Sequence, residues 1–275
     1  MSDADAALAP LRERWGLAAD GPAFATEFSV LQPVSRGERG LFLKRATSAE
    51  ERVGTDVLAW WEGRGAATVL ARYGDAALLE RASGVRDLAA LSRSGPEGDD
   101  EATRILCRTM LRLHEAGTPP RPDGLFSLRR WFRDLLDGPH AGADAELFAQ
   151  AGAVAEDLLA DPVGDVVLHG DLHHGNVLDF RPGGWRAIDP KPLHGDPGFD
   201  VANILCNPDA STALVPGRLE RTVAVIAAET SAPERRVLRW ALAWGGLSAT
   251  WSRQSGGDDT AALGVARRAR ERLGG

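Results

Sequence analysis

The segment from residue 169 to residue 189 constrains the fold of this chain more than any other stretch. It reads HGDLHHGNVLDFRPGGWRAID. Two runs that alternate apolar and polar residues, Val177–Phe180 and Trp185–Ile188, flank the turn-forming residues Arg181–Gly184. Because this pattern is typical of two antiparallel strands joined by a short connection, it predicts a β-hairpin whose loop is the four residues RPGG.

The expected hairpin brings two oxygen-bearing side chains together. Counting outward from the loop pairs Phe180 with Trp185 and, farther along, Asn176 with Asp189. Directly opposed residues lie roughly 4.5–5.5 Å apart on the same side of the ribbon. A carboxamide beside a carboxylate suits Mg²⁺, which completes its shell with water and phosphate. Asp171 reaches the same area as a proton acceptor, so the segment meets the minimum requirement of phosphoryl transfer to a hydroxyl.

A zinc site is the alternative for this segment, because His173 and His174 follow Asp171 closely. Such a site would indicate a metal-dependent hydrolase. The HxHxDH and HExxH signatures of those enzymes are absent from the chain, and adjacent histidines do not easily converge on one ion. We therefore favour Mg²⁺ at this site.

The rest of the chain divides into a sheet-rich first part and a helical second part. Four runs before residue 81 have strand character, and a capping-box pattern at Ser48 predicts that a helix starts there. The strand-like runs are Phe28–Val34, Leu41–Arg45, Ala67–Ala71 and Ala76–Glu80. Helical patterns then cover 100–115, 128–136, 143–160, 198–206, 216–230, 233–253 and 259–273. We expect an α+β chain with a nucleotide-binding unit at residues 1–80 and a catalytic, acceptor-binding unit at 81–275.

Composition excludes several classes of function. The formal charge of −7 argues against a nucleic-acid binder and favours a neutral or cationic small partner. No apolar run approaches the roughly 20 residues that span a bilayer, and the acidic start MSDADAALAP is unlike a secretory leader. Two cysteines suit a reducing cytoplasm. Only Lys44 and Lys191 are lysines among 32 basic residues, so each marks a candidate position for a compact ammonium.

The motif His169-Gly170-Asp171-Leu172-x-x-x-Asn176 has the order and spacing of the protein-kinase catalytic loop, H-R-D-L-x-x-x-N. Asp189 follows where those kinases carry the metal-binding Asp of D-F-G. Glycine after the histidine, and DPKP in place of D-F-G, instead resemble the aminoglycoside phosphotransferase family, most closely its streptomycin and hydroxyurea kinase branch. LRERWGL, HGDLHHGNVL and AIDPKPLHGDPGFDVANIL carry this resemblance over nearly the whole chain. It implies a two-lobed protein-kinase-like fold with a small antiparallel-sheet N-lobe and a larger helical C-lobe.

The resemblance also implies roles for individual residues. Asp171 would orient and deprotonate the acceptor hydroxyl, while Asn176 and Asp189 would bind Mg²⁺. Lys44, on the third strand of the small lobe, would neutralise the phosphates of ATP or another nucleoside triphosphate. The segment 79–82 resembles the hinge, in which backbone groups of Glu80 and Ala82 would bind adenine. Two further residues are supporting ones: Asp200 would brace the backbone of the catalytic loop, and His169 would support that loop.

Two departures from the family pattern stand out. The family's usual position for the Glu that pairs with the strand lysine is Gly54 here, so Glu50 or Glu51, on the same helical face, is expected to substitute, with Glu51 preferred. The phosphate-covering turn, usually glycine-rich, reads FATEFS over residues 24–29. Thr26 or Ser29 would donate hydrogen bonds to phosphate there, while Glu27 would repel it.

Two other features leave alternatives open. Lys191 either contacts phosphate or forms a salt bridge with Asp196. Trp240, Trp244 and Trp251 share one face of an expected helix, which favours a place in the core over a substrate platform.

We expect an ATP- and Mg²⁺-dependent kinase acting on a hydroxyl of a small molecule, most simply an aminoglycoside of the streptomycin type, and hence an antibiotic-resistance enzyme. Hydroxyurea or a metabolic sugar or amino sugar is the alternative acceptor. A nucleotide-binding pseudokinase with a regulatory role is the alternative of another class. We further expect a cytoplasmic monomer or weak dimer with neither nucleic-acid nor membrane partners.

Overall fold

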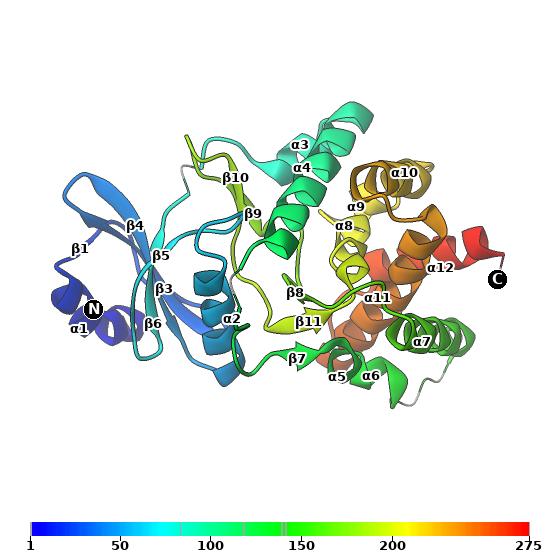
Figure 1. Ribbon diagram of the computed structural model, residues 1–275, viewed down its shortest axis with the longest axis horizontal. Coiled ribbons are helices and arrows are strands. Elements are labelled where there is room, and N and C mark those ends of the chain that lie inside the picture. The colour runs from blue at the N-terminus through cyan, green and yellow to red at the C-terminus, as the bar shows by residue number, and fades with distance from the viewer. Residues whose placement is uncertain (1, 83, 118, 139, 141, 275) are drawn as a thin grey trace.

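The computed structural model describes residues 2–82, 84–117, 119–138, 140 and 142–274. The first part of the chain forms a six-stranded antiparallel sheet, ordered β1-β3-β4-β6-β5 with β2 added beside β3. One helix, α1, lies at the outer end of this sheet next to the N-terminus, and α2 lies between the sheet and the rest of the molecule (Figure 1). These elements are α1 (Asp3–Trp15), β1 (Ala18–Ala19), β2 (Phe24–Ala25), β3 (Ser29–Arg36), β4 (Arg39–Ala46), α2 (Ala49–Trp60), β5 (Val69–Tyr73) and β6 (Ala76–Glu80).

The second part is mainly helical, with two small sheets on the side that faces the first part (Figure 1). Its helices are α3 (Leu88–Arg93), α4 (Pro96–Glu115), α5 (Leu128–Trp131), α6 (Arg133–Leu136), α7 (Ala145–Ala160), the 3₁₀ turn η1 (Pro197–Phe199), α8 (Ala202–Cys206), α9 (Ala210–Ala213), α10 (Arg218–Thr230), α11 (Glu234–Ser255) and α12 (Thr260–Leu273). Its strands are β7 (Phe126–Ser127), β8 (Val166–Leu168), β9 (Val177–Asp179), β10 (Trp185–Ala187) and β11 (Leu193–Gly195).

The predicted α+β class, with an antiparallel sheet followed by a helical part, is confirmed. The division at residues 1–80 and 81–275 stays a prediction; residues 1 and 275, its outer ends, lie outside the described part of the chain. The structure has α1 and two short strands before Phe28, where the sequence pattern predicts no element. One expected helix is interrupted: residues 128–136 form α5 and α6, which meet at Phe132.

The packing of α11 explains why the second part holds together. This helix packs against α7, α10 and α12 and carries Trp240 and Trp244, which are 0% and 5% exposed. Both tryptophans pack around the buried ring of Phe199, so their interpretation as core residues is confirmed. In the sheet-rich part a separate apolar cluster lies between α1 and the sheet, built from Leu8, Val34, Leu41, Leu43 and Leu78 among others.

Helix α2 begins as its sequence predicts. The Ser48 hydroxyl accepts a hydrogen bond from the backbone N–H of Glu51 at 3.1 Å, which satisfies one of the unpaired donors of the first turn. Val57, Leu58 and the following Trp61 are buried. The Trp61 indole stacks on the imidazole of His169 at 6.3 Å between ring centroids, so the end of α2 contacts the segment that carries His169 and Asp171.

The β9–β10 hairpin forms, but its expected register is wrong by one residue. Phe180 pairs with Gly184, whose carbonyl accepts its N–H at 2.8 Å, and Asn176 faces Ile188 instead of Asp189. The reason is Gly184: its φ of +77° lies in the left-handed region that glycine enters readily. It therefore closes the turn with Phe180 and leaves three residues in the loop.

Backbone hydrogen bonds attach this hairpin to the first part of the chain. The Ala187 N–H donates to the Gly65 carbonyl at 2.8 Å, and the Ala67 N–H donates back to the Ala187 carbonyl at 2.8 Å. The hairpin thus bridges both parts of the molecule. Within the described residues, none of the helices combines the length and the apolar character that crossing a membrane takes.

Candidate active site

A cavity of about 570 Å³ lies between the first sheet, α2 and the hairpin. Its apolar lining includes Leu31, Phe42, Leu79, Leu178 and Ile188, which suit a flat aromatic ring. All seven positions that the sequence assigned to nucleotide or metal line this one cavity: Ser29, Lys44, Glu51, Glu80, Ala82, Asn176 and Asp189. The fold brings them together from four segments of the chain that lie far apart in the sequence.

Lys44, on the third strand across the sheet, joins the two acidic sides of the cavity. Its ammonium forms an ion pair with Glu51 of α2 and a second one, at 2.6 Å, with Asp189. Burial alone would lower the pKa of Lys44, but the Asp189 and Glu51 carboxylates outweigh burial and hold this pKa above its ordinary value. The ammonium is therefore permanently charged, as phosphate neutralisation requires.

Glu51 is the lysine's partner on the helix. Its carboxylate contacts Lys44 and accepts a hydrogen bond from the Ser29 hydroxyl at 3.2 Å. The helix cap at Ser48 uses only the backbone N–H of Glu51, so the side chain stays available for the lysine. The preference for Glu51 over Glu50 therefore agrees with the geometry. Since the buried Ser29 hydroxyl donates to Glu51, we assign Ser29 to holding that carboxylate rather than to direct phosphate contact.

The structure also explains why the expected Glu position is a glycine. A Cβ atom at Gly54 would lie 2.5 Å from the carbonyl oxygen of Pro190. Real side chains essentially never approach that closely, so α2 packs against the Asp189–Pro190 segment only with glycine at this position. The acid therefore comes from Glu51, one turn earlier on the same face.

Asp189 ends the hairpin with its backbone turned into the left-handed region, at a φ of +57°. Burial alone would raise the pKa of its carboxyl group, but the Lys44 ammonium outweighs burial and holds this pKa below the ordinary range. The carboxylate is thus ionised and 44% exposed beside the carboxamide of Asn176 in the same cavity. These two hard oxygen donors fit a Mg²⁺ ion that takes its other ligands from phosphate and water.

Asp171 lies next to this cavity without lining it. One carboxylate oxygen accepts a hydrogen bond from the Asn203 amide at 2.9 Å and the other from the Asn176 amide at 3.2 Å. The side chain is 32% exposed, so an incoming hydroxyl group has access to it. Asn176 also donates to the Asp171 carbonyl at 2.9 Å, which ties the proposed base to the proposed metal ligand.

The loop that carries Asp171 rests on a buried polar cluster. The Asp200 carboxylate accepts the backbone N–H groups of His169 and Gly170 at 2.9 and 2.8 Å, which is the brace that the resemblance implied. The Asp200 carboxylate also contacts the His114 imidazole at 2.9 Å. The His169 ring lies within hydrogen-bond distance of the Ile188 carbonyl, at 2.9 Å. His169 therefore supports the loop and does not face the cavity.

The two histidines after Asp171 do not form a metal site with it. His174 is 2% exposed and points into the protein, while the His173 ring stays 3.7 Å from the Asp171 carboxylate and accepts the Gly175 N–H. Among the described residues no group of three or more His, Cys, Asp or Glu side chains is arranged to hold a metal ion. This geometry gives no support to the zinc alternative.

The turn over the cavity carries aromatic residues where the family pattern has glycines. Phe24 and Phe28 are 45% and 43% exposed and line the cavity together with Thr26 and Glu27. The Thr26 hydroxyl donates to the Ser29 carbonyl, so it holds the turn. The expected effect of Glu27 on phosphate stays a prediction.

Lys191 lines the same cavity, with its ammonium 5.8 Å from the centre of the Phe28 ring. Asp196 instead pairs with Arg236 and accepts the N–H groups of Val163 and Gly198. Of the two alternatives for Lys191, the geometry therefore favours the contact with phosphate over the salt bridge.

Two residues of the site were not found from the sequence. His114 lies at the end of α4, and its only sequence signal is a basic residue in a helix's last turn. Asn203 donates to Asp171 from α8, within the run DVANIL, which carries part of the family resemblance but predicts no role for this residue. Its signal was weaker still, because a single asparagine inside an apolar run is also typical of a helix end.

Comparisons with known proteins agree on one family. Residues 14–256 match the model of the aminoglycoside/hydroxyurea antibiotic resistance kinase family. Over 244 residues, 87% of this chain and 90% of the relative, the chain is 47% identical to streptomycin 3''-kinase of Klebsiella pneumoniae. It is 37% identical to streptomycin 6-kinase of Streptomyces griseus over 69% of this chain and 62% of that one.

A solved structure supports the fold. A thermostable mutant of an aminoglycoside phosphotransferase, in a ternary complex with ADP and hygromycin B, superposes with a TM-score of 0.65 at 20% identity, covering 95% of this chain and 97% of the other. The predicted protein-kinase-like fold is thereby confirmed. The family match and the curated relatives confirm the expected small-molecule kinase activity. The chain belongs to the aminoglycoside/hydroxyurea antibiotic resistance kinase family.

Proposed function

We propose that the protein transfers the γ-phosphoryl group of ATP, with Mg²⁺, to a hydroxyl group of streptomycin. One observation carries the chemical part: the Lys44 ammonium and the oxygen donors Asn176 and Asp189 line one cavity. A partly exposed carboxylate, that of Asp171, is hydrogen-bonded to Asn176 at the edge of this cavity. The relative with 47% identity over 87% of the chain is named a streptomycin kinase, as are two further relatives, which supports the choice of acceptor. A fourth relative, 36% identical over 73% of the chain, is named a hydroxyurea phosphotransferase.

In this proposal the nucleotide occupies the cavity of about 570 Å³. Backbone groups of Glu80 and Ala82 bind adenine at the end of β6, and the apolar lining covers its faces. Lys44 leaves Asp189 to contact the nucleotide phosphates, while Glu51 keeps the ammonium in place. Asn176 and Asp189 would hold Mg²⁺, which would supply positive charge to the transferring phosphate.

Asp171 acts as the proton acceptor. It takes the proton of the acceptor hydroxyl while that oxygen forms its bond to the γ-phosphorus and the bond to the ADP leaving group breaks. The Asn176 and Asn203 amides fix the carboxylate for this step.

The alternatives rank lower on specific grounds. The family name includes hydroxyurea kinases, but the identity of 47% to a streptomycin kinase over nearly the full chain favours streptomycin. A pseudokinase is disfavoured because the lysine, its helix partner, both oxygen donors and the acid are all in place. We expect a small-molecule partner rather than nucleic acid, and a monomer or weak dimer.

The test is an assay of ADP release and of phosphorylated product by mass spectrometry. Streptomycin, hydroxyurea and hygromycin B are compared as acceptors, with and without Mg²⁺. We expect turnover with streptomycin that stops when EDTA removes the metal. Turnover with hydroxyurea but not with streptomycin contradicts the proposal. The absence of turnover with all three acceptors contradicts it as well.

Variants assign the roles. Asp171→Asn is expected to lower kcat by about 10²- to 10⁴-fold, the range of general-base catalysis, with ATP binding nearly intact. Lys44→Ala should weaken ATP binding instead. Asp157→Asn, an exposed carboxylate on α7 that pairs with Arg239, is the matched control and should behave as the parent protein. Parent-like turnover in Asp171→Asn refutes the base assignment.

A further inference from the structure

The Asp171 carboxylate is held by an amide whose own orientation is fixed. The Asn203 oxygen accepts hydrogen bonds from the Trp244 indole N–H at 3.2 Å and from the Asn207 amide at 2.9 Å. An indole N–H only donates, so the oxygen end of the Asn203 carboxamide faces Trp244 and its NH₂ end faces Asp171. With Asn203 only 9% exposed, no water competes freely for this contact.

Asn207 in turn is held at the end of α8. Its amide also donates to the Asn203 carbonyl at 2.9 Å. The Arg218 guanidinium donates to the carbonyls of Leu205 and Asn207 at 3.1 and 2.9 Å. A helix of five residues (Ala202–Cys206) has little stability of its own, so this guanidinium fixes where the helix ends and where Asn207 points.

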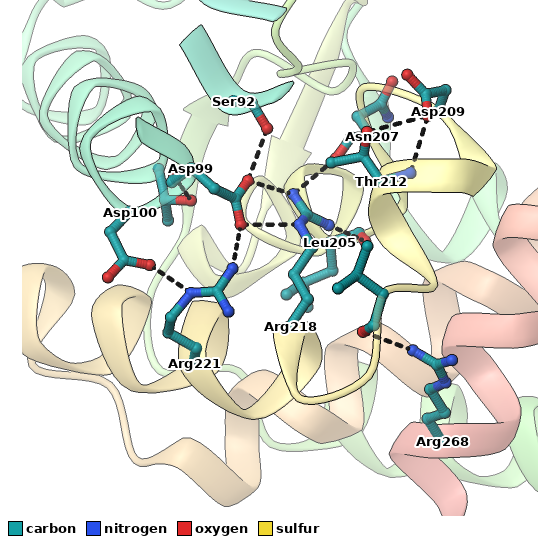
Figure 2. Close-up of polar contacts among 12 residues, drawn as sticks. Ser92, Asp99, Asp100, Leu205, Asn207, Asp209, Thr212, Arg218, Arg221 and Arg268 are labelled. Atoms are coloured by element: carbon teal, nitrogen blue, oxygen red, sulfur yellow. Dashed lines mark hydrogen bonds and ion pairs between the residues drawn. The ribbon is translucent and has the colours of Figure 1, made fainter. Parts of the chain in front are cut away.

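Arg218 is anchored in the helical part of the chain by a buried ion pair (Figure 2). It is 2% exposed and forms two hydrogen bonds of 2.9 Å to the Asp99 carboxylate of α4. Asp99 also accepts from Ser92 at 2.6 Å and from Arg221 at 2.8 Å. Burial alone would raise the pKa of Asp99, but its hydrogen bonds, that from Arg218 above all, hold this pKa below its ordinary value.

A buried pair of this kind contributes little net stability because removing both charges from water costs nearly as much as their attraction returns. What it does supply is a fixed direction: the planar guanidinium presents its remaining N–H groups at set angles. Here those groups meet the end of α8. The contacts therefore run without interruption from Asp99 through Arg218, Asn207 and Asn203 to Asp171.

We propose that Asn203 is a positioning residue for Asp171, and that the Asp99–Arg218 pair sets its place through Asn207. This inference rests on the proposed function, because it concerns the same carboxylate. The Asn203 amide fixes the rotamer of Asp171 so that one carboxylate oxygen faces the acceptor hydroxyl. A misplacement of about 1 Å at such a site costs on the order of 100-fold in rate.

The experiment uses an isosteric change. Asn203→Asp keeps the side-chain size and the oxygen that accepts from Trp244 and Asn207, but it replaces the donor to Asp171 with a negatively charged acceptor that repels this carboxylate. We expect kcat with streptomycin to fall about 10- to 100-fold, while KM for ATP, measured together with kcat, stays within about twofold because Asn203 does not line the nucleotide cavity. Asn207→Ala should cause a smaller fall in kcat, since Trp244 still holds Asn203.

Gln150→Glu is the matched control, an amide-to-acid change on α7 away from the site; kcat should not change. A purely structural role for Asn203 predicts the reverse pattern, with Asn203→Ala impaired and Asn203→Asp close to the parent protein. That pattern, or parent-like kcat in both variants, overturns the inference. If Asp171→Asn is inactive while both Asn203 variants are active, the positioning role fails and the proposed function stands. If Asp171→Asn is active, the proposed base itself fails.

Discussion

Lys44 on β4 and Glu51 on α2 form an ion pair in which each side chain is 9% exposed. Asp189 approaches the same ammonium at 2.6 Å from the far side of the cavity. Lys44 thus lies between Glu51, its partner on the helix, and Asp189, an acid of the proposed metal site. The predictions that follow test the parts of this arrangement one at a time.

Glu51→Gln removes the charge that keeps Lys44 in place. We expect kcat/KM for ATP to fall about 10- to 100-fold, the size of a lost hydrogen bond between charged groups. Glu50→Gln is the control, because Glu50 makes no described contact with Lys44. Steady-state kinetics with ATP as the varied substrate measure this effect. Equal losses of kcat/KM in the two variants would exclude Glu51 as the specific partner of Lys44.

Gly54→Ala tests the close packing of α2 on the Asp189–Pro190 segment. Because the new Cβ would lie 2.5 Å from the Pro190 carbonyl oxygen, we expect the free energy of unfolding to drop by about 1–3 kcal/mol. Gly152→Ala, in the helix α7, meets only the Leu135 carbonyl at 4.0 Å and should instead gain about 0.5–1 kcal/mol. Urea unfolding measures the free energy of unfolding of both variants. Equal values in the two variants would contradict the close packing of α2 on the Asp189–Pro190 segment.

Lys191→Met keeps the apolar stem of this side chain and removes its charge. Since Lys191 lines the nucleotide cavity, we expect KM for ATP to rise about three- to tenfold, with Lys191→Arg close to the parent protein. Arg235→Met, an exposed charge removal on α11, controls for net charge. An unchanged KM in Lys191→Met would exclude a phosphate contact.

The stability of the protein should fall at mildly acidic pH because of His174. Burial, assisted by the Arg218 charge, lowers the pKa of His174 from 6.5 to about 3. Below pH 6.5 the His174 imidazole therefore binds a proton in the unfolded chain but not in the folded chain. As a result, the free energy of unfolding decreases as the pH falls. By pH 5 this amounts to about 2 kcal/mol.

His174→Leu removes this contribution and leaves that of the other histidines. Urea unfolding at pH 7.5 and pH 5 should show a shallower loss of stability in the variant than in the parent protein. The same loss in both would mean that His174 is not the group responsible.

Most residues of the candidate site could be predicted from the sequence, because they belong to short contiguous motifs. Asp171, Asn176 and Asp189 were found from spacing, and Lys44 from resemblance supported by the rarity of lysine. The hairpin register was missed, because whether Gly184 belongs to the loop or closes it depends on a single backbone angle. That one-residue error leaves Asn176 and Asp189 in one cavity but not directly opposed.

What could not be found from the sequence depends on contacts between distant segments. Asn203 and Arg218 are ordinary helix residues until the fold places Asn203 against Asp171 and Arg218 against the end of α8. Gly54 was read as a departure from the family, and only the position of the Pro190 carbonyl explains it. Helix α1 was missed because Pro10 within it weakens a helical pattern in the sequence.

The contact between Lys44 and Asp189 joins residues 145 positions apart in the chain, one from each half of the molecule. Lys44 keeps its second partner, Glu51, when Asp189 moves away, so the proposed metal alone would not leave the ammonium unpaired. Nucleotide without metal, by contrast, would take the ammonium from Asp189 and leave this carboxylate beside the phosphates with no cation of its own. We therefore expect the two halves of the molecule to exchange this contact when nucleotide and metal bind together.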